Sequence, residues 1–224
     1  MSDPEKLADH AFRERLQHGA CRVGISLDGP QLERLERYFE VLLRWNRKIS
    51  LTALPLEGLP DRTLNRIFIE PFQAARFVDD SPLRWFDLGS GGGSPAVPLK
   101  VVRPQLRLTL VESKSRKAAF LREVVRSLKL TDTDVLPVRI EELAIGGSCG
   151  HVDLLTVRAV RVDRSFLRTA ATLLRTDGRL FLFGSRPLRE WTANFQLMEQ
   201  LKLSDGASAL YVLRRTEGGA GDGR

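Results

Sequence analysis

A cluster of glycines between two hydrophobic segments is the part of the sequence best suited to binding a small molecule. The segment Trp85–Pro98 runs from a short apolar stretch into four glycines, Gly89, Gly91, Gly92 and Gly93. Glycine clusters also form plain surface turns, but a backbone that lies against a ligand has no room for Cβ atoms at its closest points. The amides that open the following helix then carry a partial positive charge toward that ligand. The pattern predicts a strand, a glycine turn and a helix that hold a nucleotide-like cofactor.

A carboxylate at the end of the next predicted strand supports a cofactor site. The strand expected over 106–111 is followed by Glu112. In the dinucleotide-binding fold, an acidic residue about 20 residues after the glycine turn accepts hydrogen bonds from ribose hydroxyls. A glutamate after a strand also serves as a solvated helix cap, but its distance from Gly89 favours the ligand role.

Two spacings decide which cofactor the turn suits. Starting at Gly89, the place of the third small residue in a dinucleotide fingerprint falls on Ser94, and starting at Gly91 it puts Pro95 among the amides that should hold a pyrophosphate. A nicotinamide-dependent oxidoreductase is therefore the competing interpretation. The turn from Asp87 to Gly93 resembles the first motif of S-adenosylmethionine-dependent methyltransferases, whose ligand has no phosphate. We expect S-adenosylmethionine as the cofactor, in contact with Asp87, Gly89, Gly91, Gly93, Ser94 and Glu112.

A second pattern follows the helix that begins near Asp28: Trp45 and Asn46 are followed by Ser50, Leu51 and Thr52. It resembles the bacterial small-subunit (16S) ribosomal RNA methyltransferase G family, also called glucose-inhibited division protein B, which has Trp-Asn followed by Asn-Leu-Thr, with asparagine at the position of Ser50. The segment 110–124 is similar to the family's second motif and 137–143 to its third. The resemblance implies that Glu112 holds the donor's ribose, that Ile140 lines the adenine and that Glu141 lies beside it.

The same resemblance implies how the RNA is held. Arg158 matches the arginine of a Ser-Arg-Ala pattern after a strand and is a candidate for binding a carboxylate or an RNA phosphate. An ion pair with Asp153 or Glu141 is the structural alternative. Asn46 and Arg186 are further candidates for positioning the substrate, Arg186 because Ser185 stands where the family carries lysine. Trp45 or Phe68 is a candidate for stacking on a base turned out of its helix.

Three departures from the family lie in the segment 61–78, which is predicted as one helix. The family has an Arg-His-Ile-x-Asp-Ser pattern there, but this chain has Ile67 for the histidine, Glu70 for the aspartate and Pro71 for the serine. Ile67 is apolar where the family has a titratable side chain, and the proline bends a helix or breaks its hydrogen-bond ladder. These departures leave open a non-catalytic RNA-binding relative.

The expected reaction does not require a general base. The sulfonium donor is already activated, so methyl transfer mainly needs alignment of the two reactants. The family implies 7-methylguanosine as the product, and the nitrogen at position 7 of guanine has a free lone pair at neutral pH. The lack of a recognisable catalytic triad or metal cluster is therefore compatible with an enzyme.

Composition and charge favour a nucleic-acid partner. The chain has 224 residues with 35 Lys and Arg against 28 Asp and Glu, a net charge of +7, and its isoelectric point is near 9.9. This excess attracts polyanions such as ribosomal RNA or the small ribosomal subunit. The two cysteines, Cys21 and Cys149, have no metal-binding spacing, and no segment has the ~20 apolar residues of a membrane span. We expect a cytoplasmic monomer without a metal or a membrane contact.

Alternating apolar segments predict the fold class. Strands expected over 83–88, 106–111, 133–138, 152–157 and 179–184 alternate with helices, which indicates an α/β, doubly wound, mostly parallel sheet of the Rossmann-like class I methyltransferase type. A closing hairpin over 195–203 and 209–214 brings the sheet to seven strands. Helices over 4–18, from Asp28 onward and over 61–78 form an N-terminal extension. We expect the extension over 1–80, the methyltransferase core over 81–215 and a flexible tail over 216–224.

Overall fold

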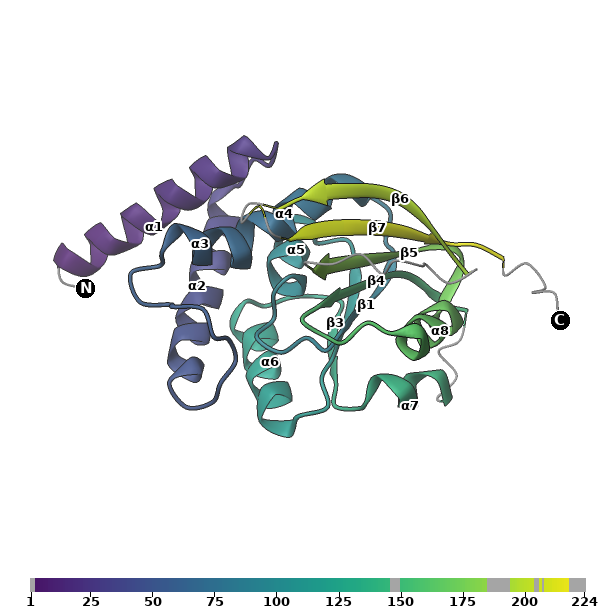
Figure 1. Cartoon of the computed structure of the whole chain (residues 1–224). Coiled ribbons are helices and arrows are strands. Elements are labelled where there is room, and N and C mark those ends of the chain that lie inside the picture. The colour runs from purple at the N-terminus through teal and green to yellow at the C-terminus, as the bar shows by residue number, and fades with distance from the viewer. Residues whose placement is uncertain (1–2, 146–149, 185–193, 204–205, 207, 218–224) are drawn as a thin grey trace, which may run out of the picture.

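The computed structural model describes residues 3–145, 150–184, 194–203, 206 and 208–217. It contains one seven-stranded sheet with the strand order β3-β2-β1-β4-β5-β7-β6, covered by helices on both faces (Figure 1). The strands are β1 (Arg84–Leu88), β2 (Arg107–Val111), β3 (Thr133–Leu136), β4 (Val152–Arg158), β5 (Leu174–Gly184), β6 (Phe195–Lys202) and β7 (Ala209–Arg215). Strands β1 to β5 pair in parallel, and β7 joins β5 and β6 antiparallel. The predicted fold class and closing hairpin are confirmed.

Strand register brings the predicted site residues to one edge of the sheet. In the central strand β1, Leu88 lies beside Val111 of β2 and Val157 of β4. The glycine turn, Glu112 and Arg158 follow or end these strands, and so they meet at the carboxyl edge. Ligands of open α/β sheets bind at this edge.

Two hydrophobic cores separate the helices into two layers. One face of the sheet is covered by the N-terminal helices and by those after β1 and β2: α1 (Asp3–Arg22), α2 (Gly29–Asn46), α5 (Ala96–Val102) and α6 (Ser115–Ser127). The other face packs on α7 (Ile140–Ile145) and α8 (Arg164–Leu173). The first core extends from Leu16 in α1 to Val212 in β7. The N-terminal helices share this core with the sheet, and the division into an extension over 1–80, a methyltransferase core over 81–215 and a tail remains a prediction.

The segment 61–78 differs from the single helix that the sequence predicts. It consists of α3 (Asp61–Leu64), the π-helical turn η1 (Asn65–Ile69), α4 (Glu70–Ala74) and the 3-10 turn η2 (Ala75–Phe77). The backbone N–H of Glu70 donates to the carbonyl of Asn65, five residues earlier. Pro71 follows at once and has no N–H to continue an α-helical ladder, which gives a physical reason for the irregular turn.

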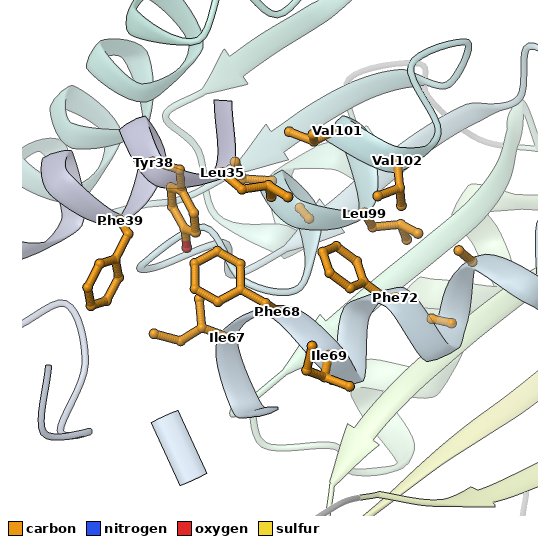
Figure 2. Close-up of a cluster of buried hydrophobic side chains, with 14 of the residues drawn as sticks. Leu35, Tyr38, Phe39, Ile67, Phe68, Ile69, Phe72, Leu99, Val101 and Val102 are labelled. Carbon is orange, nitrogen blue, oxygen red and sulfur yellow. The ribbon is translucent and has the colours of Figure 1, made fainter. Parts of the chain in front are cut away.

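Phe68 lies among the buried side chains of the first core (Figure 2). Its side chain is fully buried, with ring centroids 5.8 Å from Phe12, 6.0 Å from Tyr38 and 6.2 Å from Phe39. The prediction that Phe68 stacks on a base is therefore wrong, because the apolar face of its helix packs inward. Trp45 is partly buried, and its Nε1 donates to Glu123 at 2.8 Å.

Some element ends also differ from the predictions. Helix α1 continues past Gly19 to Arg22, whereas the sequence predicts an end near Gly19. A Cβ at Gly19 would lie 2.6 Å from Cδ1 of Ile69, so this glycine permits close packing of two helical segments. Strand β5 begins at Leu174, ahead of the predicted 179. From residue 218 onward the expected tail lies outside the described residues.

Candidate active site

A cavity of about 1000 Å³ lies at the carboxyl edge of the sheet. It is lined by α2, the loop 51–55, the segment from α3 through η1 to the start of α4, the glycine turn after β1, the segment from Glu112 to Lys117 after β2, and the end of β4. Its charged lining residues are Arg62, Arg66, Glu70, Glu112, Lys117 and Arg158. The cavity is large enough for a cofactor-sized molecule.

The glycine turn has the backbone shape that the sequence predicts. Gly89 has φ of 74° and Gly93 has φ of 88°, and both lie in the left-handed region that favours glycine. A Cβ at Gly89 would lie 2.6 Å from Cγ2 of Val160. The buried hydroxyl of Tyr38 donates to the carbonyl of Gly92 at 2.6 Å, and burial raises the pKa of Tyr38, which keeps this donor protonated. Helix α2 thus holds the turn in place.

Glu112 faces the glycine turn across the cavity edge. Its Oε2 accepts from the backbone N–H of Gly91 at 3.0 Å, and its Oε1 accepts from that of Lys114 at 2.9 Å. The side chain lines the cavity, although the residue is only 7% exposed. The predicted convergence of the turn and this carboxylate on one cavity is confirmed. Each carboxylate oxygen retains acceptor capacity for a ligand hydroxyl.

Asp87 supports the turn from below and does not line the cavity. It is 2% exposed, and it accepts a hydrogen bond from Oγ1 of Thr156, which itself accepts from Nε1 of Trp85 at 2.9 Å. The hydroxyl of Ser90 donates to the backbone carbonyl of Asp87 at 2.9 Å. Burial raises the pKa of Asp87 from 3.8 to about 6.

This raised pKa predicts a pH-dependent stability that depends on one residue. Because the folded state disfavours the charged carboxylate, the contribution of Asp87 is fully present below about pH 4 and is lost as the pH rises through 6. Asp87→Asn removes this titrating group. Between pH 4 and pH 7, the free energy of unfolding of the wild type should therefore fall by about 2–3 kcal/mol relative to that of the variant. Urea unfolding at both pH values measures this, and a constant difference would contradict it.

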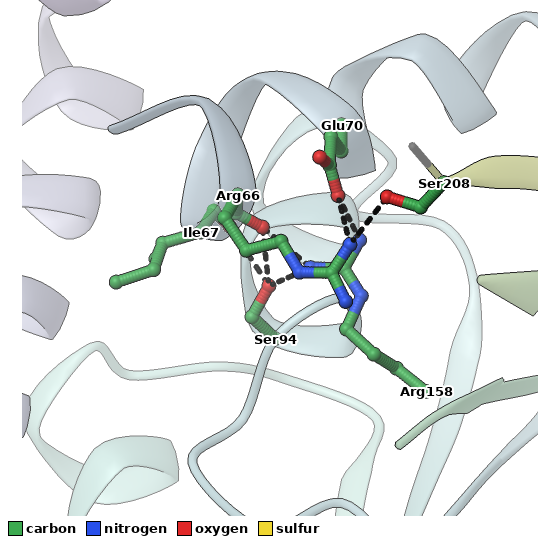
Figure 3. Close-up of polar contacts among 6 residues, drawn as sticks. All are labelled: Arg66, Ile67, Glu70, Ser94, Arg158 and Ser208. Carbon is green, nitrogen blue, oxygen red and sulfur yellow. Dashed lines mark hydrogen bonds and ion pairs between the residues drawn. The ribbon is translucent and has the colours of Figure 1, made fainter. Parts of the chain in front are cut away.

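Arg158 and Glu70, which both line the cavity, form a buried ion pair (Figure 3). Nη2 of Arg158 lies 2.9 Å from Oε2 of Glu70, and the side chains are 8% and 1% exposed. Arg66 adds a second contact to the same oxygen at 3.2 Å and donates to Ser208 at 3.1 Å. Burial lowers the pKa of Arg158 to about 10, while Glu70 acts in the opposite direction. The expected alternatives for Arg158, pairs with Asp153 or Glu141, are wrong.

The irregular turn η1 supplies further contacts to this pair. A proline at position 71 cannot donate to the carbonyls of Arg66 and Ile67, the acceptors of a π-helical and an α-helical bond. Instead, Nη1 of Arg158 donates to the carbonyl of Arg66, and the hydroxyl of Ser94 donates to that of Ile67 at 2.9 Å. The departures at 70 and 71 therefore allow η1 to contact Ser94, next to the glycine turn, and Arg158 at the end of β4.

Other predicted site residues lie away from the cavity. The side-chain oxygen of Asn46 accepts from the backbone N–H groups of Leu51 and Thr52, both at 3.0 Å, so Asn46 shapes the loop that lines the cavity. Gly93 is part of the turn without lining the cavity. Ile140 packs on the second core and Glu141 is exposed, and neither lines the cavity. Their contact with adenine remains a prediction. Arg186 and Ser185 lie outside the described residues.

Several residues that line the cavity were not among the predicted site residues. Tyr38 lies three residues after Leu35 on the apolar face of α2, and this helical spacing was a usable signal. Arg66 belongs to the same segment as the departures but was not singled out. Lys117 lies on the first turns of α6 without a distinctive pattern around it. Ser90 and Gly92 were inside the predicted turn.

The strand order and the position of the cavity define a Rossmann-like methyltransferase fold. The chain is structurally similar to an S-adenosylmethionine-dependent methyltransferase from Aquifex aeolicus, with a TM-score of 0.53, 14% identity, and coverage of 72% of this chain and 96% of the other. It is also similar to TYW2 from Pyrococcus horikoshii in complex with MeSAdo, with a TM-score of 0.52, 13% identity and coverage of 68% and 61%. At these identities the likeness concerns the fold alone.

Sequence comparison then identifies the family. The model of "rRNA small subunit methyltransferase G" (GidB) matches residues 31–210. Ribosomal RNA small subunit methyltransferase G from Geobacter sp. (strain M21) is 34% identical over 95% of this chain and 94% of its own. The protein of that name from Stutzerimonas stutzeri (strain A1501) is 35% identical over 94% and 99%. The chain belongs to the rRNA small subunit methyltransferase G family.

Family membership settles the class of enzyme and its cofactor. The protein is an S-adenosylmethionine-dependent rRNA methyltransferase. The nicotinamide-dependent alternative is wrong. A nicotinamide cofactor would need the backbone N–H groups from Gly91 onward to bind its pyrophosphate. The N–H of Gly91 donates to Glu112 instead, and Pro95 has no N–H group. Within the described part of the chain, no helix is long and apolar enough to cross a membrane.

Proposed function

We propose that this protein transfers a methyl group from S-adenosylmethionine to the nitrogen at position 7 of a guanine in small-subunit ribosomal RNA. The observation that carries the proposal is the cavity at which the glycine turn, Glu112 and Arg158 meet. The family name supports the RNA, and the volume and lining of the cavity support a donor and one base held side by side.

The residues around the cavity fit the donor. The free acceptor positions of Glu112 suit two ribose hydroxyls. Arg158 lines the cavity. We propose that its guanidinium group attracts the carboxylate of the donor or an oxygen of the base. Ile140 and Glu141 are retained as the proposed adenine neighbours.

The proposed chemistry needs alignment and no proton transfer. S-adenosylmethionine supplies an electrophilic methyl group on a positively charged sulfur. The lone pair of the guanine nitrogen forms a bond to the methyl carbon, the carbon–sulfur bond breaks with its electron pair going to sulfur, and the positive charge passes to the guanine ring. The role of this chain is therefore to hold the two reactants in line and to exclude water. Ile67, on the cavity wall, contributes an apolar surface for this.

Labelled S-adenosylmethionine and small-subunit RNA from cells lacking this methylation test the proposal. We expect label in the RNA, recovered as 7-methylguanosine after digestion. Parallel reactions with free RNA and with assembled small subunits show which is the substrate. Donor binding without incorporation into either would favour the non-catalytic RNA-binding relative, and label on another atom would contradict the guanine assignment.

We also propose that the protein acts as a monomer in the cytoplasm. The ribosomal substrate supports this compartment. Among the described residues, the large hydrophobic side chains with high exposure are Leu197 and Met198, both on the edge strand β6. This small area is well below what a stable dimer buries.

A further inference from the structure

A second hollow, of about 570 Å³, lies beside the cavity at the carboxyl edge of the sheet, which we call the donor cavity. Its walls are the segment 48–50 after α2 and the segment 113–117 at the start of α6. The two helices are in direct contact, because the ring of Trp45 in α2 packs on Phe120 in α6 with centroids 6.0 Å apart. This contact fixes the two walls of the hollow relative to each other.

Cations and hydroxyl groups line this hollow. The lining residues are Lys48, Ile49, Ser50, Ser113, Lys114, Ser115, Arg116 and Lys117, and no carboxylate is among them. Ser50 is one of the positions at which this chain departs from the family pattern. Lysine and arginine side chains donate hydrogen bonds and carry charge, and serine hydroxyls donate as well. This set of groups suits an anion with several acceptor oxygens.

The four cations of the hollow differ from many others in the protein. Arginines such as Arg13, Arg37 and Arg175 lie within ion-pair distance of carboxylates. Among the residues that the structure describes, Lys48, Lys114, Arg116 and Lys117 have no such side-chain partner. Like charges gathered around one hollow repel each other, and a bound anion removes that repulsion.

The position of the hollow indicates which anion binds there. Lys117 lines both the hollow and the donor cavity, and Ser50 is followed directly by Leu51 and Thr52, which line the donor cavity. An RNA strand that places one base in the cavity must run its backbone over an adjacent surface. Phosphate contacts of this kind fix the position of a strand without reading its sequence.

We propose that the hollow formed by residues 48–50 and 113–117 binds a backbone phosphate of the substrate RNA next to the nucleotide that enters the donor cavity. The proposal rests on the proposed function, because it takes ribosomal RNA as the ligand. It assigns to α6 a role in RNA binding that is separate from donor binding. The phosphate contacts lie on the side chains at 48, 114 and 116, with Lys117 between the two sites.

A double variant with a matched control on the same helix tests the proposal. Lys114→Gln with Arg116→Gln removes two charges from the hollow. Arg122→Gln with Arg126→Gln removes two exposed charges further along α6, away from both sites, where neither side chain has an ion-pair partner among the described residues. Melting temperatures within about 2 °C of the wild type establish that both variants fold.

Binding of a small-subunit RNA fragment is measured at several salt concentrations without the donor. We expect the dissociation constant for RNA to rise about tenfold in Lys114→Gln/Arg116→Gln, and the slope of log affinity against log salt to fall by about one to two. The control should change the constant by less than about threefold. The affinity for S-adenosylmethionine should be unchanged in both.

Two outcomes would overturn the proposal. Equal losses of RNA affinity in the two double variants would mean that only the overall charge matters. A weaker affinity for S-adenosylmethionine with unchanged RNA binding would assign the hollow to the donor. Because the assay reads binding and not methylation, methylation of another RNA atom would contradict the proposed function and leave this test intact.

Discussion

Replacing Glu112 with glutamine should weaken the binding of S-adenosylmethionine by about a hundredfold. The carboxylate accepts from the N–H groups of Gly91 and Lys114 and faces the donor cavity. A glutamine places an NH₂ group against one of these N–H donors and takes away the negative charge that we propose accepts from the ribose hydroxyls. Two charge-assisted hydrogen bonds lost or weakened correspond to about 3 kcal/mol, which is about a hundredfold in affinity.

Isothermal titration with S-adenosylmethionine, on the wild type and on Glu112→Gln, measures this effect. Glu57→Gln serves as the control because Glu57 is exposed on the loop before α3 and does not line the cavity. We expect the control to bind the donor as the wild type does. A Glu112→Gln variant with an unchanged dissociation constant would show that the donor occupies another part of the cavity.

The donor side of the site was predictable from the sequence because it depends on local patterns. A strand, a glycine turn and a second strand ending in an acid occupy one continuous stretch. Parallel pairing of β1 with β2 then places Gly89 and Glu112 at the same edge without information from elsewhere in the chain. Asp87 lies in this region as predicted, but it supports the glycine turn and does not line the cavity. The sequence does not reveal this, because the burial of Asp87 depends on its contacts with Thr156 and Trp85.

The contacts of Arg158 were less predictable because they join residues far apart in the chain. Asp153 was a reasonable partner for Arg158 by nearness in sequence, but five strand residues span about 16 Å along β4. The structure pairs Asp153 with Arg175 instead. The partner of Arg158 is Glu70, the first residue of α4, directly after a π-helical turn that a helical periodicity does not reveal. Sequence reasoning identified Glu70 and Pro71 only as departures from a pattern.

These two departures belong to one arrangement. Pro71 frees the carbonyls of the preceding turn, and Arg158 and Ser94 occupy them, while Glu70 neutralises Arg158. A buried arginine with its charge compensated keeps one N–H, on Nε, without a partner among the described residues. The geometry thus couples the stability of this region to the position of Arg158 on the cavity wall.

Replacing Glu70 with glutamine should therefore lower the free energy of unfolding by about 3–5 kcal/mol. The substitution leaves Arg158 charged and buried without its carboxylate, and removing one partner of a buried pair costs about that much. For a chain of this length, the melting temperature should fall by roughly 10 °C. Urea unfolding and thermal melting at pH 7 measure both quantities.

A double-mutant cycle separates the ion pair from general disruption of the turn. Replacing both residues, as in Glu70→Gln with Arg158→Met, removes the uncompensated charge, so its loss of stability should be smaller than the sum of the two single losses by at least about 1 kcal/mol. Glu40→Gln is the matched control, because its pair with Arg37 is exposed, at 52% and 49%, and should cost less than about 0.5 kcal/mol. Additive losses in the cycle, or equal costs at positions 40 and 70, would mean that the pair does not hold Arg158 in the cavity.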